Sequence, residues 1–336
     1  MTRRATAQDV ADLAGVSRST VSLVLNGRAQ GNVSRVKQEA VRDAAEQLRY
    51  TPDAVALSLR SKRTATIGVL TWPDRRQMPI ALLGAVYTAA SQAGYLLMMV
   101  DAVRRPGQVD ALLDRRVDGF VVVAPELTPY AVPEAVAAAP TVMVNCFDEA
   151  LAASSLVPDE EGAGASAARL LLDAGHREVA VLAGTGLASE RRVDGVCRTV
   201  AAGSGEAVVV SAGHTVDDGF GAARRLLLSG APPTGLVCTH ERLALGALLA
   251  AADLGLRVPD DLSLVSLDDG EDLAGRLVPS VARVERPDEV IAAYALDLLV
   301  DQLREGRGQG RRLTFVCPVL PGTSVGPPRQ RLLRGG

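Results

Sequence analysis

The sequence is poor in the residues that build metal and redox sites. Its 336 residues include four cysteines, which lie far apart and form no CxxC pair, and three histidines at positions 176, 214 and 240. The cysteine spacing excludes zinc knuckles and thioredoxin-type motifs and is typical of a reducing compartment. The histidines form no HExxH motif, and no spacing between them would place two on one helical face. We therefore expect no metal, no cofactor and no metal-dependent enzyme.

Long apolar segments and aromatic residues are also scarce. No run of about 18 apolar residues occurs, and no apolar signal region follows the two N-terminal arginines. We therefore expect a cytoplasmic protein that is neither secreted nor membrane-spanning. Aromatic residues make up 3% of the chain, and Tyr50 is the only one before residue 64. This scarcity disfavours the aromatic platforms with which proteins bind single-stranded nucleic acid.

What the chain does have is a basic start and an acidic remainder. Residues 1–63 hold 11 lysines and arginines against 6 acidic residues, a net charge of +5. The other 273 residues hold 25 against 33, a net charge of −8. A basic segment of this kind indicates a polyanionic partner, and without aromatic residues it favours double-stranded DNA.

The basic segment opens with the pattern of two short helices. Thr6 and Asp9 form a capping-box start for a first helix, which ends near Gly15. Ser17 can cap a second helix, and Asn26 with the glycine after it provides the stop. The two helices therefore meet across a turn of only a few residues.

The spacing of Ala11, Gly15 and Val21 predicts a helix-turn-helix. Ala11 is small where the helices cross, Gly15 tolerates a left-handed turn, and Val21 packs the second helix onto the first. A third helix beginning at Ser34 would close a three-helix core. We expect base-edge contacts in a major groove from the solvent side of the second helix and phosphate contacts from its flanks. The expected DNA contacts are Thr6, Ser17, Arg18, Ser19, Thr20, Ser22, Leu23 and Asn26.

The pattern of residues 51–60 predicts a further short helix. Thr51 can act as its N-cap and Pro52 occupies its first position. A helix this short is marginal alone, so we expect it to order on DNA. There Leu59 would wedge between base steps of the minor groove while Arg60 meets the backbone. The expected hinge contacts are Ala56, Leu59 and Arg60.

From Ala65 onward, short β-rich runs alternate with helical stretches. The first series is TIGVLT, YLLMMV, GFVVVA and TVMVN, and after Leu156 the alternation restarts with EVAVLAG, EAVVVSAG, TGLVCT and LSLVSLD. Such alternation predicts parallel sheets with helices on both faces. The restart predicts two α/β lobes.

Residues 9–26 read DVADLAGVSRSTVSLVLN and closely resemble the LacI/GalR family of transcriptional regulators. The hinge segment is similar to the family's YxPxxxAxxL pattern through Tyr50, Pro52, Ala56 and Leu59. The resemblance covers about residues 5–322. It implies an α/β protein with a helix-turn-helix head, a hinge helix and a two-lobed, periplasmic-binding-protein-like body.

The resemblance also implies a function, that of a regulator and not of an enzyme. The protein would be a repressor that binds a pseudo-palindromic operator as a homodimer, controlled by a small molecule, a sugar or sugar derivative, in the cleft between the lobes. The expected boundaries are a DNA-binding domain at 1–50, a hinge at 51–63, an effector-binding and dimerisation domain at 64–325 and a flexible tail at 326–336.

Residues that follow the apolar runs are the candidate effector contacts, because open parallel sheets bind ligands beyond the carboxyl ends of their strands. Trp72 could stack on a sugar face or cover a core edge. Asp159 is either a helix-start acid or a ligand or interlobe contact. By resemblance, Arg192 matches the family's RxxG motif and Asp268 its xDD motif. The full set is Trp72, Asp74, Asp159, Arg192, Glu241 and Asp268.

The body also departs from the family's pattern. Glu241 follows His240 where the family usually has Asn-Asp, and Arg75 to Met78 replace a segment that commonly carries aromatic residues. An ordinary hexose is therefore a less certain effector than the family implies.

An alternative function is that the α/β body binds a dinucleotide instead of a sugar-like effector. Gly184 to Ser189 form a partial dinucleotide fingerprint, which would suit an NAD-dependent enzyme or a redox-sensing regulator, but a lone, incomplete match is a weak signal.

The C-terminal segment has no leucine heptads, so we expect a dimer without a coiled-coil tetramerisation tail.

Overall fold

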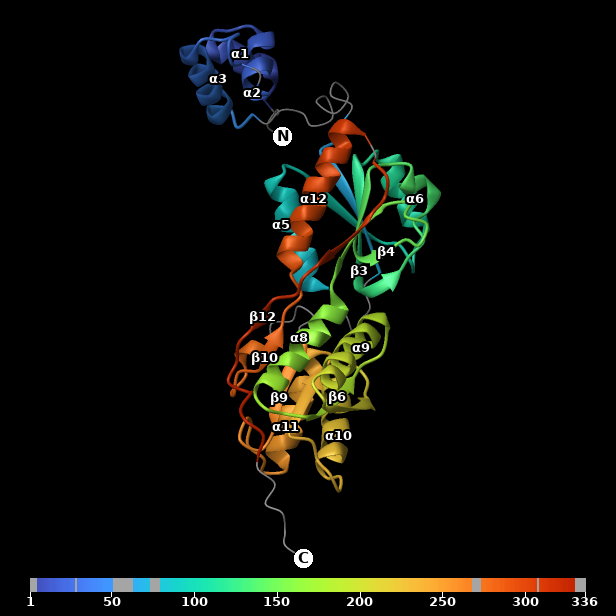
Figure 1. Ribbon diagram of the computed structural model, residues 1–336. Helices are drawn as coiled ribbons and strands as arrows, with labels where there is room; N and C mark the ends of the chain where they lie inside the picture. Colours follow the sequence, from blue (N-terminus) through green and yellow to red (C-terminus); the bar gives the residue numbers. More distant parts are fainter. Residues whose placement is uncertain are drawn as a thin grey trace, which may run out of the picture. The chain divides into compact units, whose positions relative to one another are not determined.

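The computed structural model describes residues 5–27, 29–50, 63–72, 79–267, 273–306 and 308–329. Residues 1–64 and residues 65–336 form two separate compact units (Figure 1). No helix in the described ranges is both long and apolar enough to span a membrane. All four cysteines are free thiols.

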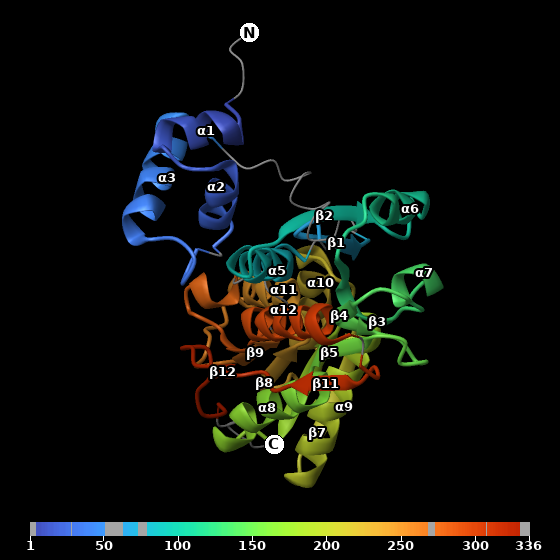
Figure 2. The ribbon, with the colours of Figure 1, turned by 90° about the horizontal axis from the view of Figure 1, so that it is seen from above.

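The described part of the first unit contains a bundle of three helices, α1 (Ala7–Ala14), α2 (Arg18–Leu25) and α3 (Arg35–Gln47) (Figure 2). Their apolar faces meet in one small core. Its buried members are Val10, Ala11, Val21, Val24, Ala29, Val41, Ala44 and Ala45. The three predicted helices are therefore confirmed. Helices α1 and α2 begin directly after their predicted caps, and α3 begins one residue after the predicted Ser34.

Side chains replace the missing backbone hydrogen bonds at two of the helix starts. The backbone N and the Oγ1 of Thr6 each donate to Asp9 Oδ2 at 2.8 Å, and Asp9 N donates back to Thr6 Oγ1 at 3.3 Å. Ser17 Oγ accepts from Thr20 N at 3.2 Å at the start of α2. Both predicted caps are confirmed, whereas Ser34 makes no side-chain cap bond to α3.

The second unit contains two six-stranded sheets, and each forms the core of one lobe. The first sheet has the strand order β11-β5-β4-β3-β1-β2, and its paired strands all run parallel. Its strands are β1 (Thr66–Thr71), β2 (Leu96–Asp101), β3 (Gly119–Pro129), β4 (Thr141–Phe147), β5 (Ser154–Pro158) and β11 (Arg312–Phe315). Helices α5 (Ile80–Gln92) and α12 (Asp288–Glu305) pack on one face, and α6 (Gly107–Asp114) and α7 (Glu134–Ala137) on the other.

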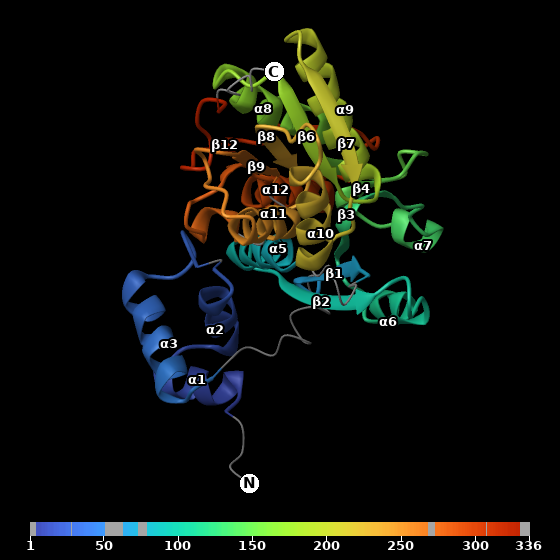
Figure 3. The same cartoon turned by 90° about the horizontal axis from the view of Figure 1, so that it is seen from below.

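The second sheet has the order β12-β10-β9-β8-β6-β7 and is parallel except for β12, which pairs antiparallel with β10 at the edge. Its strands are β6 (Glu178–Ala183), β7 (Glu206–Ser211), β8 (Gly235–Cys238), β9 (Ser263–Leu267), β10 (Ala282–Val284) and β12 (Val319–Leu320). Helices α8 (Glu160–Asp173) and α9 (Leu187–Ala202) cover one face. Helices α10 (Val216–Leu227) and α11 (Glu241–Asp253) cover the other, next to a 3-10 turn at Ala274–Arg276 (Figure 3).

The chain passes between the lobes three times. It leaves the first lobe between β5 and α8, returns between β10 and α12, and crosses again between β11 and β12. The predicted two-lobed α/β architecture is confirmed, and the restart expected after Leu156 falls inside β5. The sequence did not predict β5, β10, β11 or β12, because these strands are short and do not each alternate with a helix.

Side-chain contacts attach the C-terminal segment to the second lobe beyond residue 325. The carbonyl oxygen of Gly326 lies 2.9 Å from His176 Nε2 and accepts from Ser263 Oγ at 3.0 Å. Arg329 Nη1 lies 3.0 Å from Asp261 Oδ1. These bonds, which leave no periodic signal in the sequence, attach residues 326–329 to the second lobe, and the tail boundary at residue 326 stays a prediction.

Candidate DNA-binding surface and effector cleft

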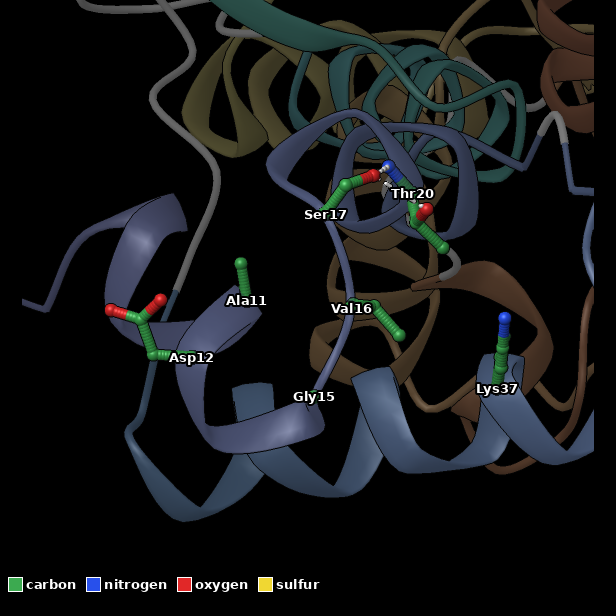
Figure 4. Close-up of a pocket in the computed structure, with 7 residues that line it drawn as sticks. All are labelled: Ala11, Asp12, Gly15, Val16, Ser17, Thr20 and Lys37. Atoms are coloured by element: carbon green, nitrogen blue, oxygen red, sulfur yellow. Dashed lines mark hydrogen bonds between the residues drawn. The ribbon is translucent and has the colours of Figure 1, made fainter.

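The turn between α1 and α2 has helix-turn-helix geometry. Gly15 has φ 61° and ψ 36°, a left-handed conformation that glycine adopts without a steric penalty. Ala11 and Val21 are each 1% exposed, so the helices cross at tightly packed small side chains. Figure 4 shows the pocket at this turn, which is lined by Ala11, Asp12, Gly15, Val16, Ser17, Thr20 and Lys37.

The side chains predicted to face base edges lie on α2. Arg18 and Ser19 are exposed in its first turn, and Ser22 and Leu23 are half-buried further along. Val21 and Val24, which alternate with them, are buried in the core of the head. Helix α2 therefore has one face in the core and another that offers a cation, hydroxyls and an apolar group to a partner.

The hydroxyls that flank α2 bond to one another. Ser17 Oγ lies 2.8 Å from Ser19 Oγ. It also lies 2.8 Å from Thr20 Oγ1, and Figure 4 shows these two residues side by side. At the other end, Asn26 Nδ2 donates to the carbonyl oxygen of Ser22 at 2.5 Å and lies 3.1 Å from Ser22 Oγ. These side chains fix the two ends of α2, and their contacts with DNA stay predictions.

Five of the predicted contact residues lie outside the described residues. They are Ala56, Leu59, Arg60, Asp74 and Asp268.

In the second lobe, Arg192 lies at the centre of a buried polar network. Its Nε donates to Glu160 Oε2 at 2.5 Å and its Nη1 to the carbonyl oxygen of Thr239 at 2.6 Å. Thr239 Oγ1 in turn accepts from Gly184 N at 2.8 Å and from Ser189 Oγ at 2.9 Å. The network joins α8 and α9 to the carboxyl ends of β6 and β8, where a parallel sheet binds ligands.

Two predicted effector contacts have bonds to the protein's own backbone. Glu241 is fully buried, and its Oε1 accepts from Leu273 N at 3.0 Å and Ala274 N at 2.8 Å. Asp159 is the N-cap of α8, and its Oδ1 accepts from Gly162 N at 2.9 Å. The helix-start role weighed for Asp159 is confirmed, at a position where the chain crosses between lobes, whereas contact of either carboxylate with an effector stays a prediction.

In the first lobe, Trp72 directly follows β1 and stacks on Tyr130, which directly follows β3. Their ring centroids lie 4.7 Å apart with 27° between the planes. Burial raises the pKa of Tyr130, and so does the neighbouring Cys146. The sequence identified Trp72 but missed Tyr130, although both satisfy the rule that ligands bind beyond the strand ends.

Three buried oxygens in the first lobe have no hydrogen-bond partner among the described residues. They are Thr71 Oγ1, Asn145 Oδ1 and Glu126 Oε1, from β1, β4 and β3. The ladder between β3 and β4 shifts register between Val123 and Thr128, so Glu126 lies in an irregular segment, the kind of feature that redirects side chains. Buried acceptors without donors are costly, which makes these oxygens candidates for a ligand's hydrogens.

The partial dinucleotide fingerprint lies at the start of α9, where its two glycines make room for neighbouring side chains. A Cβ on Gly184 would lie 2.6 Å from the His240 ring, and one on Gly186 would lie 3.0 Å from Glu126 Oε2. Glu126 thus brings a carboxylate to the helix start at which a dinucleotide would place its pyrophosphate. Packing accounts for both glycines, and the site is electrostatically unfavourable for a phosphate.

Glu126, His214 and His240 approach one another between the lobes. Glu126 Oε1 lies 3.8 Å from His214 Nδ1 and 4.0 Å from His240 Nε2, and the two imidazole rings form an edge contact with centroids 4.7 Å apart. Burial lowers the pKa of His240 well below its ordinary value, with Arg192 and other cations adding to the effect. The sequence missed this group because its spacing rule considers one helix, whereas these residues come from three separate segments.

Family comparisons agree with both units of the structure. Residues 6–53 match the profile of bacterial regulatory proteins of the lacI family, and residues 168–325 match a periplasmic binding protein-like domain. The chain is 30% identical over 336 residues to the HTH-type transcriptional repressor PurR of Haemophilus influenzae strain PittEE, covering 96% of this chain and 98% of that protein. It is 28% identical over 324 residues to the ribose operon repressor of Haemophilus influenzae strain Rd, covering 93% and 96%.

A solved structure with the same architecture is the lac repressor dimer bound to operator and the anti-inducer ONPF. The match covers 96% of this chain and 100% of that one, with a TM-score of 0.74 and 25% identity. The helix-turn-helix head, the two-lobed body and full-length similarity to known repressors lead to one assignment. The chain belongs to the lacI family of bacterial regulatory proteins.

Proposed function

We propose that the protein is a transcriptional repressor that binds a pseudo-palindromic operator as a homodimer and responds to a small molecule in the cleft between its lobes. The observation that carries this proposal is α2, which follows a left-handed turn at Gly15 and exposes Arg18 and Ser19 beside a buried core. The repressors to which the chain is similar over its full length support it.

The basic head supports DNA binding through phosphates as well as bases. Its net charge of +5 contrasts with −8 for the rest of the chain, so binding to DNA should weaken steeply as salt rises. In the proposed complex α2 lies in the major groove, and residues 51–60 form a hinge whose Leu59 enters the minor groove. Selection of bound DNA from genomic fragments would test this, and recovery of no enriched pseudo-palindrome would refute it.

A groove along α5 and α12 supports dimerisation. It has a volume of about 1020 Å³, and its lining mixes apolar side chains such as Val290 and Tyr294 with charged ones such as Glu289 and Asp297. Beside it, Tyr87 is 63% exposed on α5, and exposed apolar surface of this kind marks interaction sites. Sedimentation would show a dimer that Tyr87→Glu dissociates and that Leu228→Glu, at an exposed leucine after α10, leaves intact.

The cleft supports a hydroxyl-rich effector, a sugar or sugar derivative. Trp72 and Tyr130 supply aromatic surface, and the unpartnered oxygens of Thr71 and Asn145 can accept from hydroxyls. Arg192 and Asp268 remain the proposed polar contacts. A thermal-shift screen of sugars against NAD(H), followed by operator release, tests this class, and a shift with NAD(H) alone would favour the dinucleotide reading.

A further inference from the structure

Glu126, His214 and His240 form a compact group of nitrogen and oxygen donors, here called the interlobe triad. Glu126 comes from β3 of the first lobe, and the two histidines precede α10 and α11 of the second. One ligand atom from each residue lies within 4.8 Å of the others. Tetrahedral bonds of about 2.0–2.2 Å would place such atoms roughly 3.3 Å apart, so side-chain shifts below about 1 Å would complete the geometry.

One carboxylate oxygen of the triad has no hydrogen-bond donor among the described residues. Glu126 Oε1 is buried and accepts no hydrogen bond among the described residues, and it is the oxygen that faces both histidines. The other oxygen, Oε2, faces the start of α9 beside Gly186. A buried carboxylate oxygen without a donor is expensive, and a cation held between it and the histidines would remove that cost.

The histidines are already oriented for such an ion. His240 Nδ1 lies 3.0 Å from Thr239 Oγ1, and His214 Nε2 lies 2.6 Å from Thr185 Oγ1. Each ring therefore uses one nitrogen on a threonine and points the other toward Glu126. Metal-binding histidines characteristically donate a hydrogen bond from their second nitrogen. Thr185 N also donates to His214 Nε2 at 3.2 Å, so binding of an ion at Nδ1 would move the ring proton to Nε2, where it faces Thr185 Oγ1.

Nearby cations do not prevent binding of an ion. Three arginines, Arg192, Arg242 and Arg286, act on the His240 ring. Two of them carry their own counter-charges, since Arg192 is paired with Glu160 at 2.5 Å and Arg286 with Asp288 at 2.5 Å. Glu126 supplies the negative charge of the triad.

We propose that the interlobe triad binds a divalent transition-metal ion of the zinc class. Two imidazoles and one carboxylate form a donor set that suits Zn²⁺ and leaves a coordination position for water or an effector oxygen. Because the donors come from both lobes, the bound ion would stabilise the arrangement in which the lobes touch. That regulatory consequence rests on the proposed function, whereas the binding of the ion does not.

Cobalt(II) titration of the full-length, EDTA-treated protein tests the proposal without DNA or sugar. We expect one equivalent to bind, with visible bands typical of nitrogen and oxygen ligands, and zinc to displace it. The third histidine, His176, is buried with its ring nitrogens on Thr234 and Gly326, so a two-histidine signature must come from the triad.

Glu126→Gln and His214→Ala should each weaken zinc binding at least about 100-fold, more than the loss of an outer-shell partner usually costs. Glu190→Gln, at an exposed glutamate in the first turn of α9, is the matched control and should bind zinc normally. Thermal unfolding of the metal-free variants checks that each is folded. Absence of one-equivalent binding, unchanged affinity in both triad variants, or a thiolate charge-transfer band from Cys197 would overturn the proposal, and operator binding measured separately would still stand.

Discussion

Arg192 Nε lies 2.5 Å from Glu160 Oε2, and the two side chains are 4% and 2% exposed. This buried pair joins α9 to α8, and the second contact of Arg192, with the carbonyl oxygen of Thr239, fixes the turn before His240. The residue that the family motif predicts as an effector contact therefore also ties α8 and α9 to the carboxyl end of β8. Loss of Arg192 would disturb both roles, so its partner offers the cleaner test.

Glu160→Gln should destabilise the protein by about 3–5 kcal/mol, because it removes the buried carboxylate that pairs with the Arg192 guanidinium. Urea unfolding would measure the loss. Glu161→Gln is the matched control, since Glu161 pairs with Arg198 in solvent and such a pair contributes about 1 kcal/mol or less. Equal losses in the two variants would contradict the assigned importance of the buried pair.

The fold was predictable wherever a local rule determined it. The left-handed Gly15, the caps Thr6 and Ser17 and the strand-helix alternation each depend on neighbours within a few positions, and the structure has all of them. The edge strand β12 and the contact of Gly326 with His176 depend on segments that are distant in the sequence, so no local sequence pattern predicts them.

The candidate effector site was only partly predictable for the same reason. Arg192 and Trp72 were identified by a motif and a strand end, but their partners Glu160 and Tyr130 come from other elements. Glu126 was missed because it lies where the register of β3 against β4 shifts, so the regular alternation of a strand does not place it. The sequence therefore predicts which residues end strands, whereas the order of the strands in the sheets determines which of those ends lie close together.

Gly15→Ala should destabilise the head by roughly 1 kcal/mol, because a side chain at φ 61° is strained. The cost is conformational only, since a Cβ there would have no neighbour within 4 Å. Amide hydrogen exchange of α1 to α3 in the full-length chain would report this local change, with α8 as an internal reference. Slower exchange in the head would contradict the left-handed turn.

Stability should fall as the pH drops below about 6.5, the ordinary histidine value. Burial lowers the pKa of His176 and of His240, so the unfolded chain takes up protons that the native protein does not. Each histidine can cost up to about 1.4 kcal/mol per pH unit in the window between its unfolded and folded pKa values. Urea midpoints of EDTA-treated protein at pH 7.5, 6.5 and 5.5 would measure the slope. His176→Gln should flatten it, and parallel profiles for the two proteins would show that this histidine does not contribute.

Arg18→Ala should reduce discrimination between operator and random DNA by about 1–3 kcal/mol, since Arg18 is exposed in the first turn of α2, where a guanidinium can read a guanine edge. Arg35→Ala is the control: Arg35 begins α3, is 92% exposed and pairs with Glu39 at 3.1 Å. Its removal should leave the ratio of the two affinities unchanged, because a phosphate contact weakens binding uniformly across sequences and a solvated side chain does not affect it. Fluorescence anisotropy with operator and scrambled duplexes at fixed salt separates the two effects. If Arg18→Ala lowered both affinities equally while Arg35→Ala changed their ratio, base readout would have to be assigned to α3 instead of α2.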